Sequence, residues 1–219
     1  MARHDQIEAP RMGLSLIDTE LDPATAAPEL ELVECRATAL EDQAPLDVKS
    51  LDIAECELHG IDFAPGHLSH VDIYNSRLTK CDLSNLTTRR GSLRRVEISE
   101  SRMLGLGFGA CDADDLRVQG GTLMLASFEQ ARLQRVVFDG VNLRETTFRE
   151  AQLDGVAFLG CDLSGADFRG ARLRNCVLRG SSLDEIVGVD SLRGLAMPWP
   201  DLIASTATLA AALGIAVEE

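Results

Sequence analysis

Bulky apolar residues recur at every fifth position from residue 48 to residue 183. Between residues 121 and 185 this position is always leucine or phenylalanine, and a small or compact residue stands two positions before it. Thr88 and Ala113 break the pattern without shifting its frame. A five-residue period fits neither the alternation of a strand nor the 3.6-residue turn of a helix. The pattern therefore indicates an internal repeat over residues 46–185.

The repeat unit resembles that of the pentapeptide-repeat family, which reads roughly A-(D/N)-L-x-x. The units that match it well are Cys81–Asn85, Val141–Glu145, Cys161–Gly165 and Ala166–Gly170. The resemblance implies an all-β solenoid, a right-handed quadrilateral β-helix with four units, or about 20 residues, in each coil. Residues 46–185 would then form about seven coils. The central residue and the small residue two before it would point inward.

The spacing of the phenylalanines agrees with this architecture. Residues about 20 apart should lie above one another in successive coils. Phe108, Phe128, Phe148 and Phe168 would then form one column, and Phe138 and Phe158 another. We expect their rings to pack in offset stacks at the inter-strand spacing of ~4.8 Å.

The segments that flank the repeat differ from it in composition. Residues 1–45 contain four prolines and half of the net charge of −14. We expect an irregular acidic N-terminal cap, because the first coil would otherwise expose an apolar end; a flexible acidic tail that binds a partner is the alternative. Within it, 12–17 and 30–33 could be strands.

Residues 186–219 predict a loop and a C-terminal capping α-helix over about residues 200–213, with Pro200 near its start and Gly214 after its end. Capping helices of this kind also make a two-fold dimer contact in several members of the family, so the resemblance implies a homodimer. The candidate residues for the cap or dimer contact are Trp199, Leu202, Ile203, Leu209 and Leu213.

The composition of the chain bears on where the protein is located and on the state of its cysteines. No apolar run reaches the length of a membrane span, and the N-terminus lacks the regions of a signal peptide, so we expect a cytoplasmic protein without a membrane partner. Five of the six cysteines occupy small inward positions, and only Cys35 lies outside the repeat. We expect free thiols that fill the core.

Catalytic and metal signals are weak. His59, His67 and His70 are close in sequence but all take outward positions, which leaves a metal site as the minor alternative. The run GLGFG at residues 105–109 resembles a phosphate loop but lacks the helix that should follow it. A filled solenoid has no cleft of its own, so we expect no catalytic residue, cofactor or metal.

Three features of the expected surface could contact a partner. The first is an acidic stripe on one side of the solenoid, formed by Asp62, Asp82, Asp162, Asp184 and Glu185. The second is an outward apolar group, formed by Leu104, Met124 and Leu125, unless the N-terminal segment covers it. The third is a basic corner, formed by Arg89, Arg90, Arg94 and Arg95. Stacking would pair Arg94 with Asp114, and Arg95 with Asp115 and Arg135 beyond; the other interpretation is a contact for an acidic partner.

These features favour a non-catalytic scaffold for an unidentified protein partner. The alternative comes from the family, whose quinolone-resistance members are acidic rods that resemble DNA and bind DNA gyrase and other type II topoisomerases. The thin acidic stripe and the concentration of charge in residues 1–45 count against such mimicry. The negative net charge also disfavours direct binding of nucleic acid.

Overall fold

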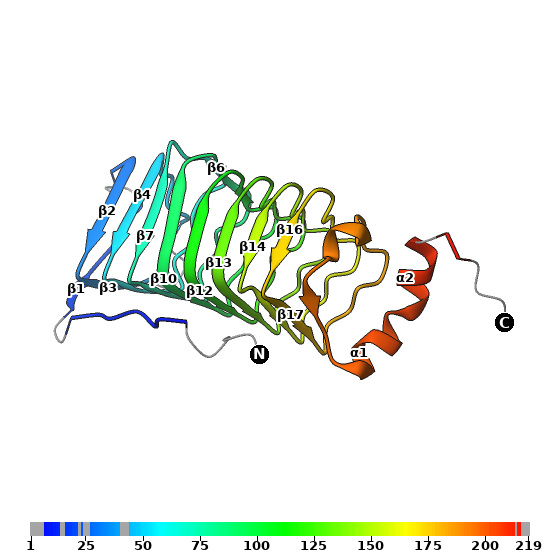
Figure 1. Cartoon of the computed structure of the whole chain (residues 1–219). Coiled ribbons are helices and arrows are strands. Elements are labelled where there is room, and N and C mark those ends of the chain that lie inside the picture. The colour runs from blue at the N-terminus through cyan, green and yellow to red at the C-terminus, as the bar shows by residue number, and fades with distance from the viewer. Residues whose placement is uncertain are drawn as a thin grey trace.

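The chain winds into a four-sided parallel β-solenoid of about nine turns, followed by short helices (Figure 1). The structure, a computed structural model, describes residues 7–13, 16–21, 23, 27–39, 44–212 and 214–215. Its strands are β1 (Ile17–Thr19), β2 (Glu29–Val33), β3 (Cys35–Thr38), β4 (Ser50–Ala54), β5 (Glu57–His59), β6 (Gly66–His67), β7 (Val71–Tyr74), β8 (Arg77–Thr79), β9 (Leu86–Thr88), β10 (Gly91–Ser99), β11 (Gly107–Phe108), β12 (Asp112–Gln119), β13 (Arg132–Asp139), β14 (Gln152–Asp154), β15 (Ala157–Leu159), β16 (Arg172–Arg174), β17 (Cys176–Arg179) and β18 (Leu195–Ala196).

Each turn contributes one segment to each of four sides. Side A contains β2, β4, β7, β14, β16 and the first parts of β10, β12 and β13. Side B contains β1, β3, β5, β8, β15, β17, β18 and the second parts of β10, β12 and β13. Side C is a series of single bridges from Asp62 to Ser182, and side D contains β6, β9, β11 and the bridges that continue them.

The five-residue period becomes this shape through backbone conformation. The fifth residue of most units adopts a left-handed conformation, as in Glu145 with φ of 54° and Gly140 with φ of 63°. This corner turns the chain onto the next side. The central residue of every unit between residues 46 and 185 except Leu173 is buried, and so are most of the small residues two positions before it. Partners in successive turns are 20 residues apart, as in Val118 opposite Phe138. The predicted inward positions are therefore confirmed.

The predicted count of about seven coils is too low, because the solenoid begins before residue 46. Residues 29–38 form β2 and β3, which confirms the strand expected at residues 30–33, but these strands belong to the solenoid instead of to an irregular cap. These strands pair in parallel with β4 and β5, placing Leu30 opposite Leu51 and Ala37 opposite Leu58. The offset here is 21 residues instead of 20. This one extra residue puts the first turn outside the five-residue frame, so the periodicity did not reveal it.

The phenylalanine columns form as predicted, with one difference. The ring pairs Phe128–Phe148 and Phe148–Phe168 are stacked at centroid distances of 5.4 Å and 4.9 Å, and Phe138–Phe158 is stacked at 5.5 Å. Phe108 instead meets Phe128 edge-on, with an interplanar angle of 71°. The turn below Phe108 carries the small core residue Thr88, which leaves an apolar cavity of about 40 Å³ next to the Phe108 ring.

The C-terminal end contains two short helices instead of the single helix predicted. A 3₁₀ turn (Val189–Leu192) and β18 precede α1 (Trp199–Ala204) and α2 (Thr206–Ala212), which meet at Ser205. The residues of this region that pack against the core are Val189, Leu192, Leu195 and Met197. Within the described residues, neither helix has the length and apolar character needed to cross a membrane.

Candidate interaction surface

The predicted acidic stripe lies on side C, but its carboxylates do not form a continuous row. Asp62 and Asp82 are neighbours, and Arg102 follows them in the same column of bridges. Arg102 forms an ion pair with Asp82 at 3.8 Å. Thr122 and Asn142 come next, before Asp162. The acidic residues therefore form two groups, one toward each end of the rod.

The second acidic group is also partly neutralised. Arg144 forms an ion pair with Asp162 at 3.4 Å. Hydrogen bonds from Ser164 lower the pKa of Asp162, and Arg144 lowers it further, so this carboxylate stays charged in neutral solution. Asp184 and Glu185 are exposed in the next turn. Side C thus carries unpaired negative charge near its two ends, and the exposed Glu145 lies between them.

The apolar group predicted on the surface lies on the same side, between these two acidic groups. Leu104 and Met124 occupy the same outward position in successive turns and are partly exposed. Leu125, at the corner beside Met124, is 49% exposed and has a left-handed φ of 60°. Glycine adopts this left-handed conformation at a lower energetic cost than leucine, yet a leucine stands here and its side chain points outward. We call Leu104, Met124 and Leu125 the side C patch.

The described N-terminal residues do not cover the side C patch. Residues 8 and 11 contact Asn75, Arg95 and Asp115, which lie at the corner between sides A and B. The order of the four sides places this corner diagonally opposite Leu125. The predicted alternative, in which the N-terminal segment folds over the apolar group, is therefore wrong for residues 7–11.

The basic corner forms only part of the predicted ion ladder. Arg135 forms the expected pair with Asp115, with Nε–Oδ1 and Nη2–Oδ2 distances of 2.8 Å and 3.0 Å, and it also contacts Asp114. Arg95 does not pair with Asp115: its guanidinium contacts Glu8 at 3.5 Å and lies 4.6 Å above the ring of Tyr74. The carboxylate of Glu8 thus takes the place of Asp115 as the partner of Arg95.

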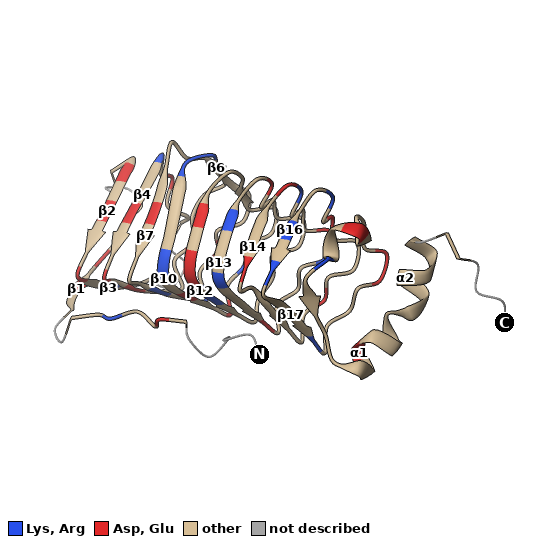
Figure 2. Cartoon of the chain, in the orientation of Figure 1, with Lys and Arg blue, Asp and Glu red and all other residues tan. Residues whose placement is uncertain are grey.

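Sequence reasoning missed two charged columns that begin in the first turn. On side B, Arg36, Glu57, Arg77 and Glu97 alternate in sign, with closest contacts of 3.0 Å between neighbours. On side A, Glu31, Asp52 and Asp72 are in register on adjacent strands. Figure 2 shows this acidic column across β2, β4 and β7. The extra residue between the first two turns hid only the first member of each column, Arg36 and Glu31; the other members are 20 residues apart within the regular frame.

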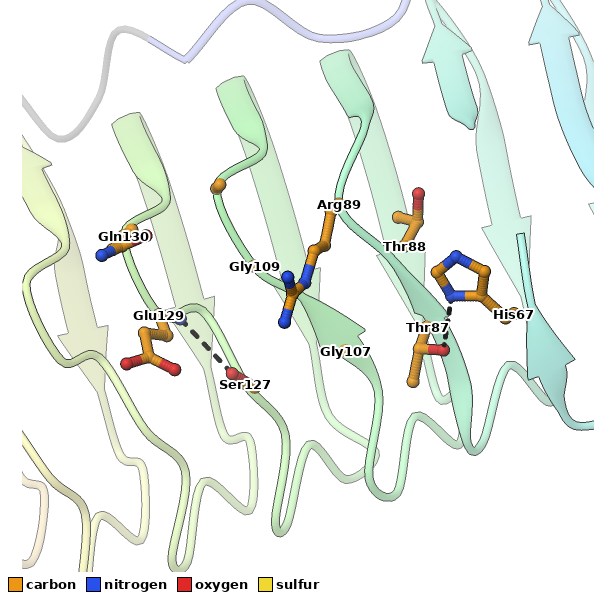
Figure 3. Close-up of a pocket in the computed structure, with 10 residues that line it drawn as sticks. His67, Thr87, Thr88, Arg89, Gly107, Gly109, Ser127, Glu129 and Gln130 are labelled. Carbon is orange, nitrogen blue, oxygen red and sulfur yellow. Dashed lines mark hydrogen bonds between the residues drawn. The ribbon is translucent and has the colours of Figure 1, made fainter. Parts of the chain in front are cut away.

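The glycine run at residues 105–109 produces a shallow hollow on side D, of about 840 Å³ (Figure 3). Gly107 and Gly109 leave its middle without side chains, while Arg89 and Glu129 lie on either side of them. His67 lies at the margin, where Nδ1 is 3.2 Å from the hydroxyl of Thr87. The hollow is open and offers charged groups for contact.

The three histidines do not form a cluster. His59 is on side B, His67 is on side D, and Nε2 of His70 is 2.7 Å from a carboxylate oxygen of Asp52. Within the described parts of the chain, no group of three or more histidine, cysteine, aspartate or glutamate side chains is arranged to hold a metal ion.

The C-terminal candidate residues lie on the terminal helices, away from the core. Trp199 is 71% exposed and Ile203 is 58% exposed, whereas Leu202 and Leu209 are partly buried. Leu213 lies outside the described residues. Asp201 anchors α1 to the last full turn by accepting a hydrogen bond from the backbone N–H of Gly180 at 2.8 Å.

The comparisons with known proteins agree with the repeat. A family model described as a pentapeptide repeat region matches residues 119–187, about a third of the chain. No curated protein matches the sequence. The five-residue geometry described above extends the same architecture on both sides of the matched segment.

Several solved structures are similar to the chain at low identity. HetL, a pentapeptide repeat protein involved in heterocyst differentiation in Nostoc sp. strain PCC 7120, is 19% identical over 90% of this chain and 95% of its own, with a TM-score of 0.34. Rfr23 from Cyanothece 51142 is 17% identical over 47% of this chain and 60% of its own, with a TM-score of 0.28. Full-length QnrB1, a plasmid-mediated fluoroquinolone resistance protein, is 17% identical over 94% of this chain and 99% of its own, with a TM-score of 0.26. At these scores none of them supports an assignment of function.

Proposed function

Because residues 119–187 of this chain are a pentapeptide repeat region, we propose that the protein is a non-catalytic scaffold that binds a protein partner through side C. The observation that carries this proposal is the side C patch, an outward apolar group with carboxylates toward both ends of the same side. Grouped apolar residues on a soluble surface mark contact sites more often than scattered ones do. The matching partner surface would be apolar at its centre and basic at its margins.

The packing of the rod supports a role in binding over one in catalysis. Leucine and phenylalanine side chains fill the interior along its length. Reactive groups such as the six thiols are buried among them. A catalytic site needs a concave, water-excluding pocket in which polar groups converge. Apart from the open hollow on side D, the sides of this rod offer rows of side chains at regular spacing.

A comparison of two matched variants tests this proposal. Met124→Lys places a charge in the side C patch, and Gln134→Lys places the same charge at the equivalent outward position of side A. Both proteins, with the wild type, would be used as baits for crosslinked capture from a lysate of the native host. We expect a partner that Gln134→Lys and the wild type retain and that Met124→Lys loses. Equal capture by all three would remove side C as the binding surface.

The alternative partner is a type II topoisomerase such as DNA gyrase, bound through partial resemblance to DNA. The net charge of −14 and the carboxylates of side C favour it. The ion pairs of Asp82 with Arg102 and of Asp162 with Arg144 weaken it, because duplex DNA carries one negative charge per ~1.7 Å along its axis. A supercoiling assay with purified gyrase separates the two. Inhibition, or relief of fluoroquinolone inhibition, at micromolar protein would establish the alternative, and their absence would exclude it.

We also propose that two copies pair through the terminal helices. Trp199 and Ile203 are exposed apolar residues on α1, and Ile215 beyond α2 is 57% exposed. Light scattering coupled to gel filtration would give the mass of a dimer for the wild type and of a monomer for Ile203→Asp. A monomeric wild type at micromolar concentration would exclude this contact.

A further inference from the structure

An apolar strip lies on the outside of side B, where it replaces the charged ladder of the first turns. Val137, Ala157 and Val177 are partners on β13, β15 and β17 and occupy the same outward column as Glu57 and Arg77. Their exposed fractions are only 2%, 0% and 6%. Leu159 packs against them from the same side, and Ile7 packs against them from the N-terminal segment.

Polar groups at the corner between sides A and B hold the backbone of the same segment. The side-chain amide of Asn75 accepts a hydrogen bond from the backbone N–H of Arg11 and donates one to its carbonyl. Asp115 accepts a hydrogen bond from the backbone N–H of Glu8 at 3.3 Å. Asn75 and Asp115 occupy the same corner position two turns apart. We call residues 7–11 the strap. Asn75 and Asp115 form hydrogen bonds with its backbone near both of its ends.

Two side chains of the strap also contact the solenoid, one through an ion pair and one through apolar packing. The guanidinium of Arg95, between Asn75 and Asp115, contacts the carboxylate of Glu8 at 3.5 Å. The preceding residue, Ile7, enters the apolar strip. The corner therefore contacts an apolar residue followed directly by an acidic one.

The receiving groups are held in place by the solenoid itself. Arg95 is stacked on Tyr74, and Arg135 holds the carboxylate of Asp115, which is 8% exposed as a side chain. The strap, in contrast, belongs to none of the strands, so its release would break no ladder hydrogen bond. A preorganised site with a separable occupant is the arrangement needed for exchange of one peptide for another.

We propose that this corner is a binding site for an extended peptide segment of a partner protein, one that carries an apolar residue followed by an acidic residue, and that the strap occupies it as a built-in competitor. The charge of Arg95 and the apolar strip define this ligand chemistry. The site is separate from the side C patch, so either can fail without the other.

Hydrogen exchange of the full-length protein tests whether the strap is bound. We expect the amides of Glu8 and Arg11 to be protected, and Asn75→Ala to speed the exchange of Arg11 by about tenfold or more, because both hydrogen bonds between Asn75 and Arg11 are lost. Asn175→Ala is the matched control: Asn175 has the same left-handed corner conformation, with φ of 54° against 53° for Asn75, and is five turns further along the same edge. Unprotected amides in the wild type would overturn the proposal.

A labelled synthetic peptide with the sequence of residues 7–13, Ile-Glu-Ala-Pro-Arg-Met-Gly, tests binding in trans. The full-length double variant Ile7→Asp/Glu8→Ala should release its own strap and bind this peptide about tenfold more tightly than the wild type does. Adding Asn75→Ala should abolish that gain, and adding Asn175→Ala should not. A peptide with aspartate in place of its isoleucine should not compete. Equal binding by the double variant and the wild type would show a purely structural strap, and a dimer formed by strap exchange in the wild type would show that the occupant is a second copy; either result overturns the proposal.

Discussion

At the scale of single residues, the buried thiols have the clearest physical signature. All six cysteines are free and buried, including Cys35, whose sulfur lies 3.1 Å from that of Cys56 in the next turn. Burial raises the pKa of Cys35 and Cys111 to about 12 and that of Cys81 to about 11. The apolar interior disfavours the thiolate, so these side chains behave as small core residues.

These pKa shifts predict a loss of stability in alkaline solution. The unfolded thiols ionise near pH 9.0, and the folded ones only near pH 11 to 12. The folded state is therefore fully favoured below pH 9.0, and its advantage falls as the pH rises toward the folded pKa. We expect the free energy of unfolding, measured by urea denaturation, to fall between pH 9 and pH 11. The double variant Cys81→Ala/Cys111→Ala should fall less steeply, and parallel pH curves for the two proteins would contradict this explanation.

Two glycines with positive φ, Gly140 at a corner and Gly121 directly after one, allow the cost of backbone strain to be measured apart from the cost of a steric clash. Gly140 and Gly121 both have positive φ, of 63° and 75°. A Cβ at Gly140 would meet no atom within 4 Å, whereas one at Gly121 would lie 2.1 Å from the carbonyl oxygen of Ser101. Gly140→Ala should cost about 1–2 kcal/mol, the strain of a left-handed alanine. Gly121→Ala should cost clearly more, because the backbone must also move. If thermal denaturation showed the same loss of stability for both variants, the predicted clash at Gly121 would be disproved.

At the scale of elements, Thr88 shows how a core position can be small for a reason that volume does not explain. Its hydroxyl donates to the carbonyl of Arg90 at 2.8 Å and accepts from the Arg90 N–H at 3.1 Å. It thereby closes a corner where Arg90 lacks the left-handed conformation of the regular units. The adjoining cavity of about 40 Å³ is the consequence of using threonine there.

Two substitutions separate the hydroxyl from the cavity. Thr88→Val keeps the volume and should cost about 1 kcal/mol, because the two hydrogen bonds of the hydroxyl are lost. Thr88→Leu loses the same bonds but fills the cavity, which should recover about 1 kcal/mol at ~24 cal/mol per Å³. Urea denaturation would measure both. A leucine variant less stable than the valine variant would show that the cavity cannot accept the added carbon.

The sequence predicted the elements that depend on period and missed those that depend on single residues. The five-residue spacing shows which side of the solenoid each inward leucine or phenylalanine belongs to. Columns of residues 20 apart, such as Phe128 and Phe148, can therefore be predicted from the sequence. The first turn was missed because one added residue breaks the frame between Leu30 and Leu51. The strap could not be predicted either, since its contacts join residues 64 and 107 positions apart. No local pattern carries information at that distance.

At the scale of the whole molecule, the rod is a one-dimensional stack in which each turn contacts only its neighbours. The sum of neighbour contacts, more than any central core, should then determine stability. A complete turn would be a removable unit as long as the register of the remaining turns is kept. The 20-residue offset between partners such as Phe138 and Phe158 defines that unit.

Deletion of residues 141–160 tests this property. The joined chain would place Phe128 directly below Phe168, so the inward columns would continue, and Val137 below Val177, so the outward apolar strip would continue as well. We expect a folded protein with the circular dichroism of β-structure, cooperative unfolding and a lower melting temperature, because one set of neighbour contacts is gone. Deletion of residues 143–160 is the control. It removes two residues fewer and turns the following leucines out of the core, so this protein should aggregate. If the 18-residue deletion were as well folded as the 20-residue one, register would not be what holds the turns together.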